Sequence, residues 1–187
     1  MGFFNRFFNK VEEVNNGEAS ISELEEEIFV GTTEEEAVEY WVSMAQNIII
    51  NTMRASDGEA ERAFVVIDMR ENPAFEIFYQ FNGQLSKWED LTNEELKMKI
   101  STQLQPQAPE VAAAVNAQFE DADHPKIAFA EIQFETATSA WFSHVIWDDS
   151  EYADAPREEI VEQWFNILKA EVKNTPLDSD NKLSWYL

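Results

Sequence analysis

The sequence predicts an α+β fold in which antiparallel β-hairpins form a sheet packed against several helices. Two segments, 62–81 and 126–149, alternate side chains with a period of two, as strands do. Asn82 and Gly83 mark a tight hairpin turn, because both residues tolerate positive φ. No repeat or long linker interrupts the pattern. We therefore expect a single domain over 32–187, preceded by a separate arm over 1–31.

The first helix of the domain begins at a capping box. The Thr33 hydroxyl can accept a hydrogen bond from a free amide, and the Glu36 carboxylate can return one. The apolar spacing extends this helix to about Arg54. The other elements are expected in this order: strands over 62–70, 74–81 and 84–88, a helix from a second capping box at 92–95 to a break near Pro106, a helix from Pro109 to Phe119, the hairpin over 126–149, and a helix over 156–173.

The hairpin over 126–149 carries large apolar side chains on both faces. This pattern predicts a place in the middle of the sheet. The chain ends in an apolar group that we expect to pack on the body or on a partner: Leu183, Trp185, Tyr186 and Leu187.

The arm over 1–31 begins with an amphipathic stripe. Its apolar residues recur at helical spacing and predict a helix over 1–16. The helix could dock on the body or on a partner, or lie at a membrane surface. The stripe consists of Phe3, Phe4, Phe7, Phe8, Val11 and Val14.

Charge is the unusual property of this sequence. The chain has 187 residues, with 13 Lys and Arg against 37 Asp and Glu, a net charge of -24. Nucleic-acid binding is disfavoured, because phosphate contacts need Lys and Arg. Complementary charge favours a basic protein as partner. An acidic surface that serves only solubility, or a salt-adapted host, stays open as an alternative.

The chain contains no cysteine, which excludes thiol catalysis, disulfides and cysteine-based zinc sites. This composition fits a reducing cytoplasm, where we expect the protein. No apolar run reaches the about 18 residues that a membrane span needs. We also find no G-x-G-x-x-G or P-loop motif, and we expect no cofactor.

Histidines and carboxylates offer weak alternatives for chemistry. Asp121, Asp123 and His124 could ligate a metal, although an ordinary acidic loop is the preferred interpretation. His144 is interpreted as a hydrogen-bonded histidine of the sheet, with a ligand or a catalytic base as the alternative. We therefore expect no enzymatic activity and no metal site.

Acidic residues cluster after the second hairpin. Residues 148–162 contain seven Asp and Glu against one arginine, with aromatic residues beside them. Aromatic anchors ringed by charge are typical of protein interfaces. A hard-cation site, an acid–base pair and a solvated loop are the alternatives, and Trp147 could equally belong to the core. The predicted partner-binding residues are Trp147, Asp148, Asp149, Glu151, Tyr152 and Asp154.

The order of elements over about 62–170 resembles the YezG/EsaG-like immunity proteins of bacterial toxin systems. The residues that carry this resemblance are Phe78-Tyr79, Trp88, Trp147-Asp148-Asp149, Arg157 and Trp164. The resemblance implies a non-enzymatic antitoxin that binds a cognate toxin, often a nuclease, inside the producing cell.

Two functions are therefore expected from the sequence. The first is an acidic immunity protein that neutralises a cationic toxin. The alternative is an interaction adaptor or secretion chaperone that uses the Phe-rich helix over 1–16. Homo-oligomer formation is open under both.

Overall fold

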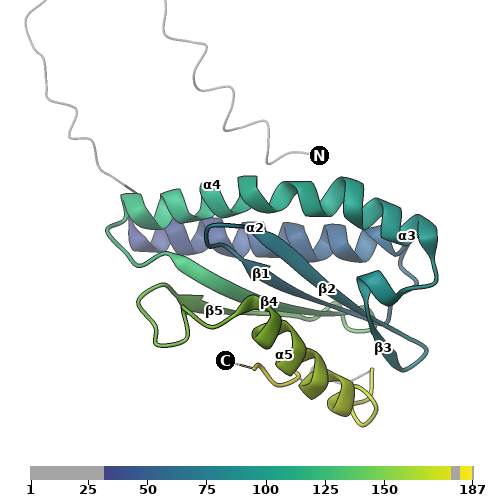
Figure 1. Cartoon of the computed structure of the whole chain (residues 1–187). Coiled ribbons are helices and arrows are strands. Elements are labelled where there is room, and N and C mark those ends of the chain that lie inside the picture. The colour runs from purple at the N-terminus through teal and green to yellow at the C-terminus, as the bar shows by residue number, and fades with distance from the viewer. Residues whose placement is uncertain (1–31, 178–181, 187) are drawn as a thin grey trace, which may run out of the picture. The chain divides into compact units, whose positions relative to one another are not determined.

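The computed structural model describes residues 32–177 and 182–186 and confirms the predicted α+β fold (Figure 1). The arm over 1–31, with its predicted amphipathic helix, and Leu187 lie outside the described residues. Five strands form one antiparallel sheet in the order β3-β2-β1-β4-β5. The strands are β1 (Arg62–Asp68), β2 (Ala74–Phe81), β3 (Gln84–Lys87), β4 (Ile127–Glu135) and β5 (Trp141–Trp147).

Helices cover both faces of the sheet (Figure 1). Helices α2 (Glu34–Ala55), α3 (Glu94–Lys99) and α4 (Ala108–Asp121) pack on one face, and α5 (Arg157–Glu171) packs on the other. Within the described residues, no helix has the length and the apolar character needed to cross a membrane.

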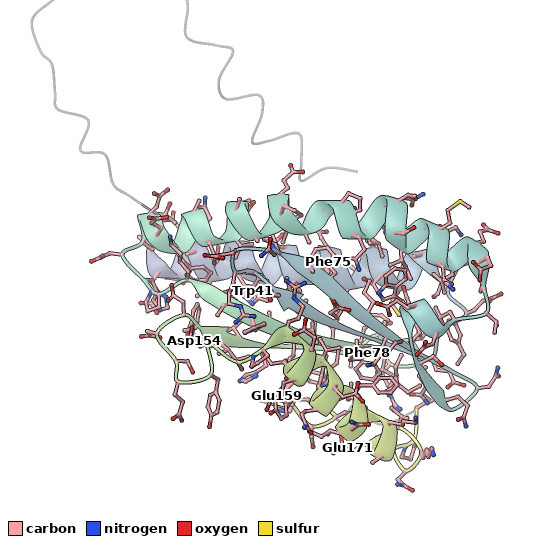
Figure 2. All side chains as sticks on the ribbon, in the orientation of Figure 1. Trp41, Phe75, Phe78, Asp154, Glu159 and Glu171 are labelled. Atoms are coloured by element: carbon pink, nitrogen blue, oxygen red, sulfur yellow. The ribbon has the colours of Figure 1, made fainter. Side chains whose placement is uncertain are left out.

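Each face has its own apolar core, because neighbouring residues of a strand point to opposite sides. Trp41 of α2 and Phe75 of β2 belong to the first core, and Phe78 of β2 belongs to the second (Figure 2). The centre of the second core is Trp164 of α5, which is fully buried and meets Phe64 edge to face, with ring centres 5.9 Å apart. The prediction that Trp164 lies in the core is confirmed.

The local signals at the start of α2 and in the first hairpin are confirmed. Thr33 N–H donates to the Glu36 carboxylate (2.9 Å), and Glu36 N–H donates to the Thr33 hydroxyl (3.2 Å). The hydrogen bonds that the Thr33 N–H and hydroxyl donate to the Glu36 carboxylate lower the pKa of Glu36. At the β2–β3 turn, Asn82 and Gly83 have φ of 49° and 71°, as a tight hairpin turn requires.

The predicted break near Pro106 is wrong. From Glu94 the chain continues through α3, a π-helical turn (Ile100–Leu104) and a 3₁₀ turn (Gln105–Gln107) directly into α4. Pro106 lies in the 3₁₀ turn and Pro109 in the first turn of α4, where the hydrogen-bond pattern of the helix changes and a missing N–H group is tolerated. The prediction of a second capping box at 92–95 is wrong, because the helix begins one residue later and N3 is then Leu96, which cannot return a hydrogen bond. Asn93 is the N-cap, and its side chain accepts from Leu96 N–H (3.0 Å).

The predicted position of the second hairpin is half right. Strand β4 lies inside the sheet between β1 and β5, but β5 forms an edge. Trp141, Val145 and Trp147 pack against the α2/α4 core, and Ile146 packs against the α5 core. Covering layers can bury both faces of a strand that has a neighbour on one side only. Apolar residues on both faces therefore did not require a central strand.

Candidate functional site

The predicted contact residues lie where β4 begins and β5 ends. Asp148 N–H donates to the Lys126 carbonyl (2.8 Å), and Lys126 N–H donates to the Asp148 carboxylate (3.0 Å). The start of α2 reaches the same place, since His124 Nε2 lies 3.7 Å from Glu34 Oε1. We call this surface the acidic end. Its exposed carboxylates are those of Glu34, Glu120, Asp121, Asp123, Asp148, Asp149, Glu151 and Asp154, the last labelled in Figure 2.

Arg70 holds the turn that carries four of these carboxylates. Its guanidinium donates to the carbonyls of Ala153 and Ala155, at 3.0 Å each. The same group lies 4.0 Å from the centre of the Phe129 ring, a cation–π contact. The turn is therefore attached to the sheet through its backbone, which leaves its acidic side chains free to face solvent.

Asp68 at the end of β1 orients Arg70 and Arg157. Its nearly buried carboxylate accepts from Arg70 (2.9 and 3.1 Å) and from Arg157 (2.9 Å). Burial alone would raise the pKa of Asp68, but the hydrogen bonds from the two arginines outweigh burial and hold it below its ordinary value. Both guanidinium groups are thus bound to Asp68 rather than to an acid of the turn.

The acidic end has little internal neutralisation. Lys126 pairs with Glu120 (2.9 Å). Among the described residues, none forms an ion pair with Asp148, Asp149, Glu151 or Asp154. Clustered charges of one sign create a field that attracts a partner of opposite sign.

The structure does not group these acids as metal ligands. Over 32–177 and 182–186, no three or more His, Asp or Glu side chains are placed to share a metal ion. The alternative of a metal at Asp121, Asp123 and His124 finds no support there. What the acidic end can supply is electrostatic attraction to a cation-rich surface.

The two aromatic residues of the prediction differ in exposure. Trp147 is partly buried, with its ring centre 4.6 Å from that of His124 and 5.2 Å from that of Phe119. Tyr152 is 49% exposed. Tyr152 is therefore the aromatic side chain that the turn presents, while Trp147 mainly packs the turn against α4.

A buried polar row on the α5 face was missed by the sequence analysis. The available signal was the polar residue at every second position of β4: Glu131, Gln133 and Glu135. The Glu135 carboxylate pairs with Arg62 (2.5 Å), which also donates to the Pro176 carbonyl (2.8 Å). Such groups need partners because desolvation is costly.

The C-terminal segment supplies several of those partners. The Gln133 carboxamide exchanges two hydrogen bonds with the backbone of Leu183 (2.8 and 3.0 Å), and Trp164 donates to the Ser184 carbonyl (2.9 Å). The prediction that Leu183, Trp185 and Tyr186 pack on the body is confirmed.

Glu131 is the least satisfied member of the row. Its side chain is fully buried, and burial raises its pKa to about 8, although Tyr186 N–H donates to Oε2 (3.2 Å). His144 Nδ1 lies 4.0 Å away, and burial lowers the pKa of His144. Glu131 Oε1 and His144 Nδ1 have no hydrogen-bond partner among the described residues, so the prediction of a hydrogen-bonded His144 is wrong at Nδ1. The row contributes to the attachment of the C-terminal segment.

No protein-family model matches the chain, and none of the curated proteins matches it significantly. The resemblance to YezG/EsaG-like immunity proteins therefore stays a prediction. Function has to be argued from the acidic end itself.

Proposed function

We propose that this protein is a non-enzymatic inhibitor of the immunity type, which binds a cationic protein toxin through the acidic end. The observation that carries the proposal is a turn anchored through its backbone, whose four carboxylates have no ion-pair partner among the described residues. The hydrogen bonds from Arg70 to the carbonyls of Ala153 and Ala155 anchor the backbone of the turn, so that less backbone ordering is needed on binding.

A basic toxin, such as a nuclease with a phosphate-binding surface, has the complementary charge. Exposed Tyr152 adds an aromatic contact from the same turn. The net charge of -24 extends the attraction beyond the contact surface. Association would be fast and dependent on salt concentration.

The first experiment identifies the partner. The tagged full chain is purified from its own cells at low salt, and bound proteins are identified by mass spectrometry. We expect one stoichiometric basic protein whose toxic activity disappears when this chain is added. Recovery of several exported or assembly proteins would instead support the adaptor or secretion chaperone, and deletion of residues 1–16 would then abolish their binding.

The second experiment tests the surface. Asp149→Lys with Glu151→Lys reverses two charges and leaves the Asp148–Lys126 hydrogen bond intact. The control is Glu89→Lys with Asp90→Lys, which reverses two exposed acids after β3, the strand at the other edge of the sheet. We expect the first pair to slow association by about tenfold at low salt and less at high salt, with little effect from the control. Equal effects of the two pairs would remove the acidic end from the proposal.

A further inference from the structure

Strand β5 leaves one edge of the sheet open. Glu135 N–H donates to the Ala140 carbonyl (3.0 Å) and Asp148 N–H donates to the Lys126 carbonyl (2.8 Å). The even-numbered residues of β5 therefore direct their backbone polar groups towards β4. Because this direction alternates along an antiparallel strand, Trp141, Ser143 and Val145 direct theirs away from the sheet. These outward groups have no hydrogen-bond partner among the described residues.

The two edges of the sheet are protected differently. Strand β3 has four residues and ends at Lys87, both of which discourage pairing with another chain. Strand β5 has seven residues, Trp-Phe-Ser-His-Val-Ile-Trp, with no Lys, Arg, Asp, Glu or Pro. Its single β-bulge lies on the β4 side of the pair. A long, uncharged, partly exposed edge is a template for strand addition.

We propose that β5 binds an extended, cationic segment of a protein partner as a sixth strand. The choice of a cationic segment rests on the proposed function. The strand itself runs directly into Asp148, Asp149 and Glu151, whose carboxylates would meet lysine or arginine at the end of the added strand. A second copy of this chain fits less well, because it would bring together two chains with a net charge of -24 each.

The edge also defines what side chains the added strand needs. On one face the new strand would lie beside Trp141 and Val145, and on the other beside Phe142 and His144. All four are partly exposed. Cross-strand pairs with aromatic and β-branched residues stabilise such a register. The expected ligand is therefore a short strand of β-branched residues with basic residues at its ends.

The probe is a peptide of nine residues in all, with two lysines at each end and alternating valine and threonine between them. It is titrated into the full chain, and amide exchange is followed by NMR. We expect the amide protons of Trp141, Ser143 and Val145 to exchange at least about tenfold more slowly at saturation, with no change for β3. The same peptide N-methylated at alternate residues loses backbone donors, and we expect it to bind at least about tenfold more weakly.

A protein variant tests the same hydrogen bonds from the other side. Ser143→Pro removes an outward N–H group that β4 does not use, and Ser143→Ala keeps it. We expect the proline variant to lose binding at least about tenfold and the alanine variant to stay within about twofold. If Ser143→Pro fails to fold, the N-methylated peptide still decides the question on the unaltered chain.

Four results would overturn the inference. Equal binding of the methylated peptide, or of Ser143→Pro, would mean attraction by charge alone. Dimerisation of the chain that Ser143→Pro abolishes would make a second copy the occupant. Backbone amides of β5 that already exchange slowly in the free chain, and exchange fast once residues 1–31 are deleted, would make residues 1–31 the strand that occupies the edge. A natural partner that is lost on charge reversal at Asp149 and Glu151, but retained by Ser143→Pro, would leave the proposed function standing and remove only the added strand.

Discussion

Replacing Glu131 with Gln should make the protein more stable at neutral and alkaline pH. The side chain is fully buried between the sheet and the C-terminal segment, and burial raises its pKa from 4.5 to about 8. Among the described residues, the titratable groups that interact with it are His144 on β5 and Tyr186 in the C-terminal segment. Neither forms a hydrogen bond with its free oxygen.

The direction in which stability changes with pH follows from proton linkage. The folded chain keeps the proton on Glu131 while the unfolded chain releases it near pH 4.5, so folding binds a proton between pH 4.5 and about 8. The contribution to stability is complete below pH 4.5 and is lost as the pH rises through 8. The loss is about 1.4 kcal/mol per pH unit, which over this interval amounts to roughly 5 kcal/mol.

Glutamine has the shape of the neutral acid and cannot ionise. Its carbonyl oxygen, in the place of Oε2, can still accept from Tyr186 N–H. We therefore expect Glu131→Gln to be more stable than the wild type by about 1–2 kcal/mol at pH 5.5, relative to any difference at pH 4.5, and by up to several kcal/mol at pH 8.

The assay is urea unfolding followed by tryptophan fluorescence at pH 5.5, 6.5, 7.5 and 8.5, at one salt concentration. Glu110→Gln is the matched control, since it removes an exposed carboxylate from α4. We expect its difference from wild type to stay within about 0.5 kcal/mol throughout. A difference for Glu131→Gln that is equally flat would show that Glu131 is already ionised at pH 5.5 and would refute the reasoning.

Three further predictions concern stability, each read as the free energy of unfolding in urea. Arg62→Met leaves the Glu135 carboxylate buried without its cation and should lower the free energy of unfolding by about 3–5 kcal/mol. Arg62→Met with Glu135→Met should lower it by less, and a double variant that is less stable than the single variant would contradict this. Asn116→Ala removes two hydrogen bonds to the backbone of Ile127 (2.9 and 3.2 Å) and should cost about 1–3 kcal/mol, while a neutral result would mean that water replaces both. Gly83→Ala places a Cβ in open space at φ 71° and should cost about 1 kcal/mol, and a stabilising effect would show that the turn changes conformation.

Local signals were sufficient for most elements. Thr33 with Glu36 predicted the start of α2, and Asn82-Gly83 predicted the first hairpin, because a cap or a tight turn depends on residues within a few positions of one another. Spacing also placed Trp164 in the core. The same reasoning failed at Pro106, since a proline can end a helix or begin the next turn and only the surrounding backbone distinguishes the two.

Tertiary structure alone decided three features that matter for function. Strand order put β5 at an edge, because β1 pairs with both β2 and β4, and no local pattern specifies such non-local partners. The return of the C-terminal segment buried Glu131, which in the sequence is one polar residue in an alternating strand. Folding also brought Glu34 and Glu120 beside Asp148, so an acidic run visible in the sequence became a larger surface. In each case the residues involved are far apart in the chain, and their proximity arises from packing on both faces of the sheet.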